Sequence, residues 1–207
     1  MKKVAIVDYG LGNLRSAYNA FRCFDVDLNV IDAGDRLADA HAIVVPGVGS
    51  FDAGIRGLRA RGHLEALQRR VVEGGVAFFG ICLGMQFVFE SSEEGSETGL
   101  GWMKGRVSRF PDGENFPKVP HIGWADVRVP RPTRLFSGIE SPSDFYFVHS
   151  YYVPLEMDGA AHAAGIAEYG FEFAAAVERD NICACQFHPE KSQLAGLKMI
   201  ENFLGAL

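Results

Sequence analysis

A strand that turns directly into a helix is the feature of this sequence that most restricts its fold. The apolar run over residues 76–81 predicts a buried strand, and the apolar residues after Cys82 predict a helix that begins at once. Gly80 and Gly84 lie two residues either side of Cys82, where a Cβ atom would collide with the neighbouring backbone. This is the Gly-x-nucleophile-x-Gly pattern of a nucleophile elbow, with cysteine as the nucleophile.

The position of Cys82 at a helix start favours a reactive thiol. Free N–H groups and the helix dipole at an N-terminus stabilise a thiolate. The alternative is an inert cysteine buried at a core turn, because free cysteines are commonly buried. A base close to Cys82 in space would decide between the two interpretations.

The first half of the chain alternates between predicted strands and helices. Short apolar or β-branched runs predict strands at 3–8, 27–32, 42–45 and 76–81. Helices are expected at 13–24 and, with a break near Gly62, at 53–73. Such an alternation predicts parallel strands with right-handed crossovers, and a ligand site at the carboxyl ends of the strands. Gly10, Gly49 and Cys82 all follow such ends.

The second half reads mainly as short strands, after a polar segment at 91–101 that we expect to be a solvated loop. The expected strands are 105–110, 125–129, 145–148, 163–168, 174–179 and 182–187, and a helix is expected at 193–204. The predicted fold class is α/β, a three-layer mixed and largely parallel sheet flanked by helices, with antiparallel additions in the C-terminal half. No linker or repeat interrupts the sequence, so we expect one domain over residues 1–207.

Composition excludes several classes of protein. The net charge of −6 argues against a nucleic-acid surface. No apolar run approaches the ~20 residues that span a bilayer. The apolar start is cut short at Asp8 and no small-residue cleavage site follows, so we expect no signal peptide and a cytoplasmic protein. The four cysteines are expected to be free thiols.

Two local motifs suggest other ligands. The Gly10–Gly12 turn begins a dinucleotide-binding pattern, but Arg15 stands where the third glycine belongs, so a tight turn is preferred. Cys183 and Cys185 alternate onto one face of a predicted strand near His188, which hints at a metal site. Residues packed so closely in one strand seldom enclose an ion, and we expect core packing and no metal.

The segment Gln-Phe-His-Pro-Glu at 186–190 supplies a candidate base at the end of an apolar strand. A residue before proline is held extended, and side chains two positions apart in extended chain point the same way. His188 and Glu190 are therefore expected to face one side together. Glu190 would fix the imidazole tautomer, and His188 would face the thiol of Cys82.

These two motifs, Gly-Ile-Cys-Leu-Gly-Met-Gln at 80–86 and Gln-Phe-His-Pro-Glu-Lys-Ser at 186–192, resemble those of the class I glutamine amidotransferase family. Members have a flavodoxin-like core and hydrolyse glutamine with a Cys-His-Glu triad, releasing ammonia. The resemblance implies that Cys82 is the nucleophile, His188 the base and Glu190 its orienting partner. It implies no metal and no organic cofactor.

Further segments extend the resemblance over nearly the whole chain. They are similar to the branch of the family formed by glutaminase subunits of imidazole glycerol phosphate synthase, of histidine biosynthesis. The segments are Asp8–Leu14, Pro46–Phe51, Lys118–Trp124 and Tyr146–Tyr151. Ala125 departs from the pattern, because many members have a more polar residue after the tryptophan.

The proposed chemistry needs two N–H donors for a developing oxyanion. Leu83, at the helix start, is the natural source of one, and the loop that contains Val48 and Gly49 is expected to supply the second. Substrate-binding candidates are Gln86, one helical turn beyond the cysteine, and three residues that line the pocket in the family, His149, Ser150 and Tyr151.

The resemblance also implies a docked partner that receives ammonia before bulk water protonates it. This partner is the cyclase subunit, a (β/α)8 barrel, in a heterodimer. The candidates for the interface are Asn13, Trp124, Tyr146 and Lys191. An aromatic residue such as Trp124 suits an interface, though burial in the core is the alternative.

Three rival functions stay open at this point. The chain could be a glutaminase that feeds a different synthase, which the segments at 8–14 and 121–124 argue against. It could be a cysteine peptidase or esterase with an open cleft. It could also be a binding module whose Cys82 is inert, in which case alkylation at neutral pH would be slow.

Overall fold

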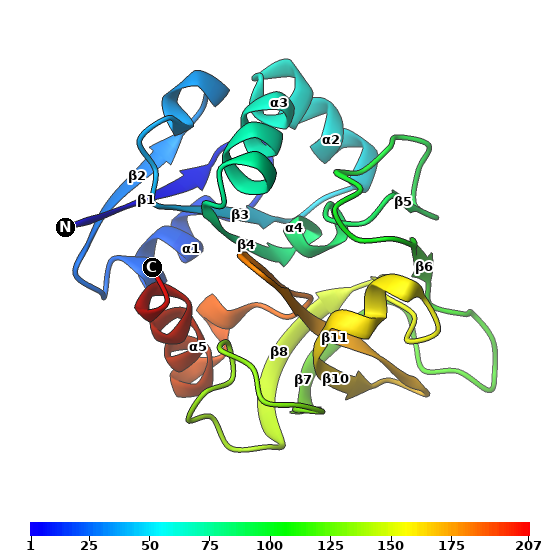
Figure 1. Cartoon of the computed structure of the whole chain (residues 1–207). Helices are drawn as coiled ribbons and strands as arrows, with labels where there is room; N and C mark the ends of the chain where they lie inside the picture. The colour runs from blue at the N-terminus through cyan, green and yellow to red at the C-terminus, as the bar shows by residue number, and fades with distance from the viewer.

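The computed structural model describes all residues from 1 to 207 and centres on one sheet of nine strands (Figure 1). These strands are β1 (Lys2–Val7), β2 (Val26–Ile31), β3 (Ala42–Gly47), β4 (Ala77–Cys82), β7 (His121–Arg128), β8 (Ser143–His149), β10 (Ala163–Glu168), β11 (Glu172–Arg179) and β12 (Ile182–Cys185). Their order across the sheet is β2-β1-β3-β4-β12-β11-β10-β7-β8.

The sheet is parallel in one half and antiparallel in the other. β1 pairs in parallel with β2 and β3, and β4 pairs in parallel with β3 and β12. From β12 through β11, β10 and β7 to β8, every pairing is antiparallel. The expected α/β fold class with C-terminal antiparallel strands is therefore confirmed, and the antiparallel strands account for half of the pairings.

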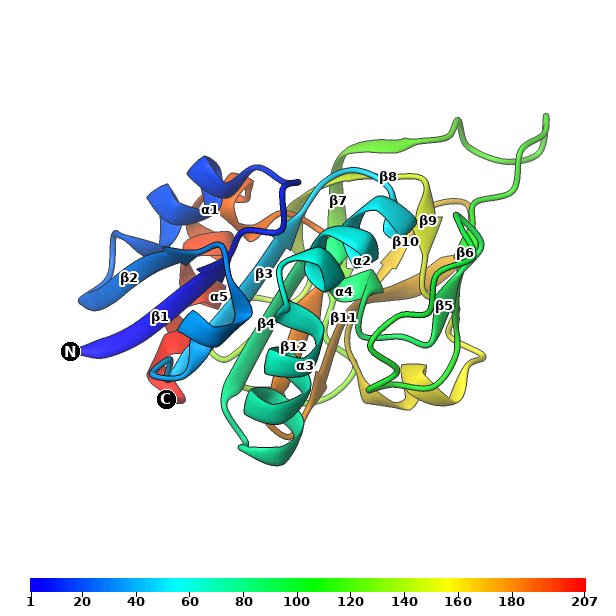
Figure 2. The ribbon, with the colours of Figure 1, turned by 90° about the horizontal axis from the view of Figure 1, so that it is seen from above.

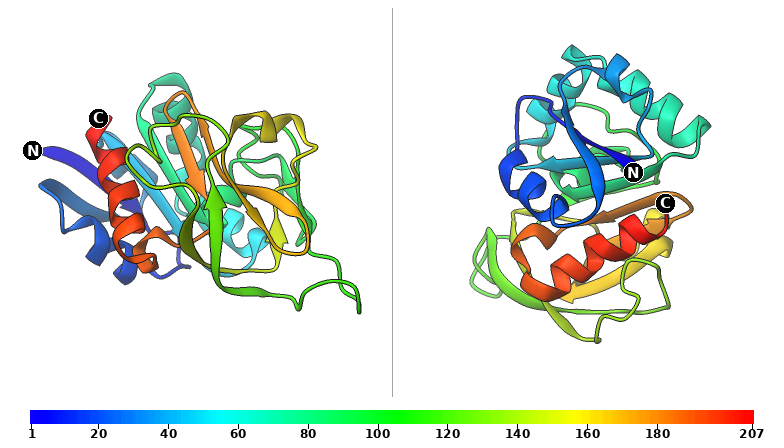
Figure 3. Two further views of the ribbon diagram at one scale, coloured as in Figure 1. Left: turned by 90° about the horizontal axis from the view of Figure 1, so that it is seen from below. Right: turned by 90° about the vertical axis from the view of Figure 1, so that its left-hand side faces the viewer.

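Helices cover both faces of the sheet and complete three layers (Figures 2 and 3). The helices are α1 (Leu14–Phe21), α2 (Phe51–Ala60), α3 (His63–Leu67), α4 (Leu83–Gln86) and α5 (Gln193–Gly205). α1 and α5 bury apolar side chains in one core cluster, and α2 and α3 bury theirs in a second cluster on the opposite face. None of these helices has the length and apolarity that crossing a membrane requires.

The helical region predicted at 53–73 is broken where expected. Gly62 has a left-handed conformation, with φ 67°, and separates α2 from α3. The last part, Gln68–Glu73, is a π-helix. Two 3-10 helices at Gly34–Leu37 and Asp158–His162 were not predicted.

A second, three-stranded sheet corrects one expectation. It consists of β5 (Ser91–Ser92), β6 (Arg106–Arg109) and β9 (Tyr151–Tyr152), in the order β5-β6-β9. The segment 91–101, expected to be only a solvated loop, therefore begins with a short strand, and Ser92 is buried. β6 matches the strand expected at 105–110. β5 and β9 were missed because two residues carry too short a pattern to predict a strand.

The register of the central strands determines where the site forms. β12 lies beside β4 with Ile182 opposite Phe78 and Cys185 opposite Ile81. The carboxyl ends of the two strands are therefore adjacent. As a result, Cys82 and the segment that follows Cys185 lie at the same edge of the sheet.

Candidate active site

The turn at Cys82 has the geometry of a nucleophile elbow. Cys82 is the last residue of β4 and has φ 55° and ψ −105°, a conformation that costs a residue with a side chain on the order of 1–3 kcal/mol. A Cβ atom on Gly80 would lie 2.5 Å from the carbonyl oxygen of Gly84, and one on Gly84 would overlap the carbonyl oxygen of Val45. Both glycines are therefore required by the close approach of three backbone segments.

His188 and Glu190 form a buried pair at the same edge. Nδ1 of His188 lies 2.7 Å from Oε1 of Glu190, and the two side chains are 2% and 3% exposed. His188 is extended, as expected before proline, but Glu190 lies in a 3-10 turn, Pro189–Lys191. The pair is therefore made across a turn, and not by alternation along an extended strand as the sequence suggested.

The surroundings of His188 favour the charged imidazolium. Burial lowers the pKa of His188, but hydrogen bonding to Cys82 and Glu190, together with their charges, raises the pKa to about 10. Nε2 of His188 is nevertheless buried without a hydrogen-bond partner of ordinary geometry. The contact of Nε2 with the thiol is thus looser than the contact of Nδ1 with Glu190, as is common in an enzyme without substrate.

Ser192 fixes the backbone of the histidine. Its hydroxyl donates to the carbonyl of His188 over 2.6 Å and accepts from the N–H of Tyr146 over 3.0 Å. The N–H of His188 donates to the carbonyl of Tyr146 over 2.9 Å. These bonds hold the histidine segment against β8, a role for Ser192 that the sequence did not predict.

A pocket of about 290 Å³ opens at Cys82 and is lined by 11 residues. Eight of them were candidates from the sequence: Val48, Gly49, Cys82, Leu83, Gln86, His149, Ser150 and Tyr151. The other three are Glu94, Pro120 and Val148. The structure therefore brings together all candidates for oxyanion and substrate binding.

Gln86 is buried and partly engaged within the protein. Its Nε2 donates to Oε1 of Gln186 over 3.2 Å and to the carbonyl of Tyr151 over 3.4 Å. Gln186 in turn places its Nε2 3.6 Å from Sγ of Cys82. Oε1 of Gln86 accepts no hydrogen bond from the protein, so it is the atom that can accept one from a ligand.

The imidazole of His149 is fully engaged, although His149 lines the pocket. Its Nδ1 lies 2.7 Å from the carbonyl of Tyr151, which can only accept, so Nδ1 carries the proton. Its Nε2 then accepts from Nδ1 of His121 over 3.1 Å. Burial lowers the pKa of His149 to about 3 and that of His121 to about 4, so the pair is neutral. His149 thus fixes the backbone of the pocket wall and has no ring nitrogen free for substrate.

Glu94 is the pocket residue that sequence reasoning missed. It is half-buried and is the only charged side chain in the lining. Its Oε2 accepts the N–H of Phe51 over 2.7 Å, and burial raises the pKa of its carboxyl group. The sequence predicts a solvated surface for its acidic stretch. The signal that could have found it is its place soon after Phe89, where the apolar run that follows the elbow ends.

The loop after β3 presents free backbone donors to the pocket. The carbonyl of Pro46 accepts from the buried hydroxyl of Tyr9 over 3.0 Å, which anchors the start of the loop. Beyond it, Val48 is exposed, Gly49 has φ 118°, and neither N–H donates a hydrogen bond within the chain. Leu83 is the first residue of α4, where helix N–H groups lack intrahelical acceptors.

Three of the four interface candidates form one cluster. Trp124, 47% exposed, packs edge-on against Tyr146 with ring centroids 5.9 Å apart. Nζ of Lys191 lies 5.5 Å from the centroid of the Tyr146 ring. Ile122, also exposed, lies two residues before Trp124 on the same face of β7. Asn13 is exposed and lies outside this cluster. Its side chain caps α1 by accepting the N–H of Ser16, so the contact that it makes stabilises the helix.

Comparisons with known proteins identify the family of the chain. The family model for glutamine amidotransferase class I matches residues 5–207. The imidazole glycerol phosphate synthase subunit HisH of Moorella thermoacetica is 45% identical over 205 residues, which cover 98% of this chain and 94% of that protein. The HisH subunit of Syntrophotalea carbinolica is 46% identical over 206 residues, which cover 97% of this chain and 98% of that protein.

The fold is also that of a known structure. A crystal structure of a glutamine amidotransferase superposes with a TM-score of 0.73 at 21% identity, over 98% of this chain and 97% of the other. At that identity the likeness concerns the fold alone. The match of the family model and the identity to full-length relatives go further, and the chain belongs to the class I glutamine amidotransferase family.

Proposed function

We propose that this chain is the glutaminase subunit of imidazole glycerol phosphate synthase. In this role it hydrolyses glutamine to glutamate and delivers the ammonia to a cyclase subunit, which makes imidazole glycerol phosphate and an aminoimidazole carboxamide ribotide in histidine biosynthesis. The full-length similarity to HisH subunits supports the assignment. The single observation that carries the chemistry is the buried His188–Glu190 pair beside the thiol of Cys82.

The first half of the reaction makes a thioester. Sγ of Cys82 attacks the side-chain amide carbon of glutamine, and the thiol proton is held by Nε2 of His188. The C–N bond then breaks, and His188 gives its proton to the departing nitrogen, which leaves as ammonia. The raised pKa of His188 supports this role, because it favours the proton on the imidazole.

The second half hydrolyses the thioester. His188 takes a proton from water, the resulting hydroxide attacks the thioester carbon, and the C–S bond breaks to release glutamate and restore the thiol. In both halves Glu190 holds Nδ1 of the imidazole, so that Nε2 is the nitrogen that faces the reacting atoms. Its charge also stabilises the imidazolium.

Each half passes through a tetrahedral oxyanion that needs two N–H donors. The N–H of Leu83, at the start of α4, is one, and that of Val48 or Gly49 is the other. The free backbone donors of the loop support this proposal. Loss of one such donor costs ~3 kcal/mol in a comparable hydrolase, so the position of this loop matters for the rate.

Glutamine is recognised by the polar groups that the pocket leaves free. The carboxylate of Glu94 suits the α-ammonium group, because it is the only charge in the lining and a buried ion needs a partner. Oε1 of Gln86 is free to accept a hydrogen bond, and the segment of Ser150 and Tyr151 lines the same pocket. Together these groups favour a free amino acid over a peptide chain.

The partner binds on the cluster formed by Ile122, Trp124, Tyr146 and Lys191. Tyr146 in this cluster adjoins the proposed base, since the N–H of His188 is bonded to the carbonyl of Tyr146. A partner docked there would receive ammonia close to the site. Exposed aromatic residues are typical of interface centres. We further propose that the chain acts as one domain and in the cytoplasm, where its four free cysteines would stay reduced.

Glutamate release, measured with and without the purified cyclase subunit and its nucleotide substrate, tests this function. We expect release that rises when the cyclase subunit and its nucleotide are present. Turnover of peptides or esters but not of glutamine would instead indicate a peptidase or esterase. Glutamine hydrolysis that is indifferent to this partner would indicate a glutaminase of another synthase.

A further inference from the structure

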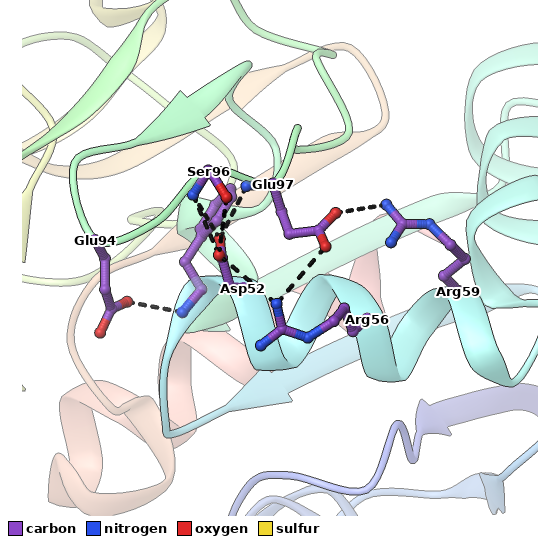
Figure 4. Close-up of polar contacts among 7 residues, drawn as sticks. Asp52, Arg56, Arg59, Glu94, Ser96 and Glu97 are labelled. Carbon is purple, nitrogen blue, oxygen red and sulfur yellow. Dashed lines mark hydrogen bonds and ion pairs between the residues drawn. The ribbon is translucent and has the colours of Figure 1, made fainter.

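Asp52, in the first turn of α2, binds the backbone of the segment that follows Glu94 (Figure 4). Its Oδ1 accepts the N–H of Ser96 over 3.0 Å and the N–H of Glu97 over 2.9 Å, and its Oδ2 lies 3.4 Å from the hydroxyl of Ser96. Three donors from two consecutive residues thus converge on one carboxylate. This arrangement ties the 91–101 segment to the helix that follows the oxyanion loop.

Two arginines of α2 bind Glu97 in the same segment. Arg59 donates to Oε2 of Glu97 over 2.8 Å, and Arg56 lies 3.7 Å from both Glu97 Oε1 and Asp52 Oδ2 (Figure 4). The backbone N–H groups of Glu97 and Ser96 lower the pKa of Asp52, and the hydrogen bond from Arg59 lowers the pKa of Glu97. Both carboxylates are therefore charged at neutral pH.

Glu94 lies between this cluster and the substrate pocket. Its Oε2 accepts the N–H of Phe51, the residue before Asp52, so adjacent residues of α2 hold the segment at two points. Gly95 allows this close approach, because a Cβ atom there would overlap Oδ1 of Asp52. On the other side, the N–H of Glu94 donates to the hydroxyl of the buried Ser92 over 3.1 Å.

We infer that Asp52 is a positioning residue for substrate specificity: it holds Glu94 where its carboxylate meets the α-ammonium group of an amino-acid substrate. This inference rests on the proposed glutaminase function. Asp52 lines no part of the pocket, so its influence on the substrate passes through Glu94. Recognition of the α-ammonium group of the substrate therefore depends on Asp52, whereas the reactivity of the Cys82 thiol does not.

Alkylation of Cys82 by two electrophiles separates these effects. The diazoketone analogue of glutamine carries the α-ammonium group, and iodoacetamide does not. The readout is the ratio of the two second-order rate constants for Cys82. In Asp52→Asn we expect this ratio to fall roughly tenfold, the order of one hydrogen bond to a charged group, with the iodoacetamide rate unchanged.

Three further variants make the test specific. Gly95→Ala keeps every charge but displaces Asp52, so it should lower the ratio as Asp52→Asn does. The double variant Asp52→Asn with Glu94→Gln should lower the ratio no further than Glu94→Gln alone, since Asp52 acts through Glu94. Asp32→Asn is the matched control, because Asp32 pairs with Arg36 four residues on and lies outside the pocket lining. It should leave the ratio unchanged.

The outcomes distinguish failure of the inference from failure of the proposed function. Equal losses with both electrophiles in Asp52→Asn, or a full additional loss in the double variant, would overturn the positioning role. A wild-type ratio no higher than that of a free thiol would mean that the pocket does not recognise the glutamine skeleton. That result would contradict the proposed function, and the inference with it.

Discussion

Nδ1 of His188 and Oε1 of Glu190 lie 2.7 Å apart in a pair of side chains that are almost completely buried. Glu190 thereby leaves Nε2 as the nitrogen available to the thiol, and together with Cys82 it raises the pKa of His188. A short segment of chain thus fixes the orientation of the proposed base, and Cys82 and Glu190 together favour its charged form. The consequences can be measured residue by residue.

Replacement of Glu190 by glutamine removes the charge but keeps the size of the side chain. We expect an intact fold and a kcat at least about a hundredfold lower, within the range of general acid–base catalysis. Since Glu190 raises the pKa of His188, the pH profile of kcat/KM should also shift to lower pH. Glu201→Gln is the control, because Glu201 is exposed and pairs only with Lys198. A wild-type rate and profile in Glu190→Gln would refute the role.

The neutral pair of His121 and His149 predicts sensitivity to acid. Burial lowers both pKa values, to about 4 and about 3, so below pH 6.5 the unfolded chain binds protons that the folded chain does not. The contribution of the neutral pair to the free energy of unfolding is therefore complete above pH 6.5 and falls as the pH falls toward 4, by about 3 kcal/mol for each histidine.

Urea unfolding at a series of pH values checks this prediction. His121→Phe, which keeps a ring on Phe147 and Tyr169, should show a shallower loss of unfolding free energy below pH 6.5 than the wild type. The exposed His41, replaced by glutamine, is the matched control. Identical slopes in wild type and His121→Phe would show that the pair does not carry the acid sensitivity.

The four cysteines should differ in reactivity. Burial raises the pKa of Cys183 to about 12 and raises that of Cys185 as well, so neither thiol should react with iodoacetamide in the folded protein. Cys82 lines the pocket and Cys23 is exposed, so both should be labelled. Mass spectrometry of the peptides should show that glutamine protects Cys82 and not Cys23. If Cys82 reacted as slowly as Cys183, the inert binding module would be the better interpretation.

Trp124 should be a major contributor to partner binding. Because it is about half exposed, Trp124→Ala should fold normally, yet it should weaken the Kd for the cyclase subunit about thirtyfold, as loss of a hot-spot residue does. Isothermal titration calorimetry measures this effect. Val72→Ala, an equally exposed apolar residue that precedes the amino end of β4, should leave the Kd unchanged. Equal affinities for the two variants would place the partner elsewhere.

The sequence predicted the parts of the molecule that local chemistry determines. The apolar runs and glycine turns predicted the alternation from β1 to β4, and the spacing of Gly80, Cys82 and Gly84 predicted the elbow. The Asn13 cap of α1 and the break at Gly62 were also correct, since each depends on one residue type at one position. Of the eight candidates that line one pocket, His149, Ser150 and Tyr151 came from family resemblance, and the others came from the elbow and the chemistry proposed for it.

The features that the sequence did not predict depend on contacts between distant segments. Glu94 lines the pocket in a segment whose next residues donate their N–H groups to Asp52, more than 40 residues earlier in the chain. The engagement of His149 depends on the pairing of β7 with β8, which places His121 opposite it. The His188–Glu190 contact was expected, but the 3-10 turn that makes it was not, because the proline pattern indicated extended chain.

The division of labour between two subunits is the central claim, and the Cys82→Ala variant tests it most directly. The complex with the cyclase subunit is assayed for imidazole glycerol phosphate, once with glutamine and once with added ammonia as the nitrogen source. Because only the thioester chemistry needs the thiol, we expect Cys82→Ala to abolish synthesis from glutamine and to leave synthesis from ammonia at the wild-type rate. Loss of both activities, or retention of both, would contradict this account.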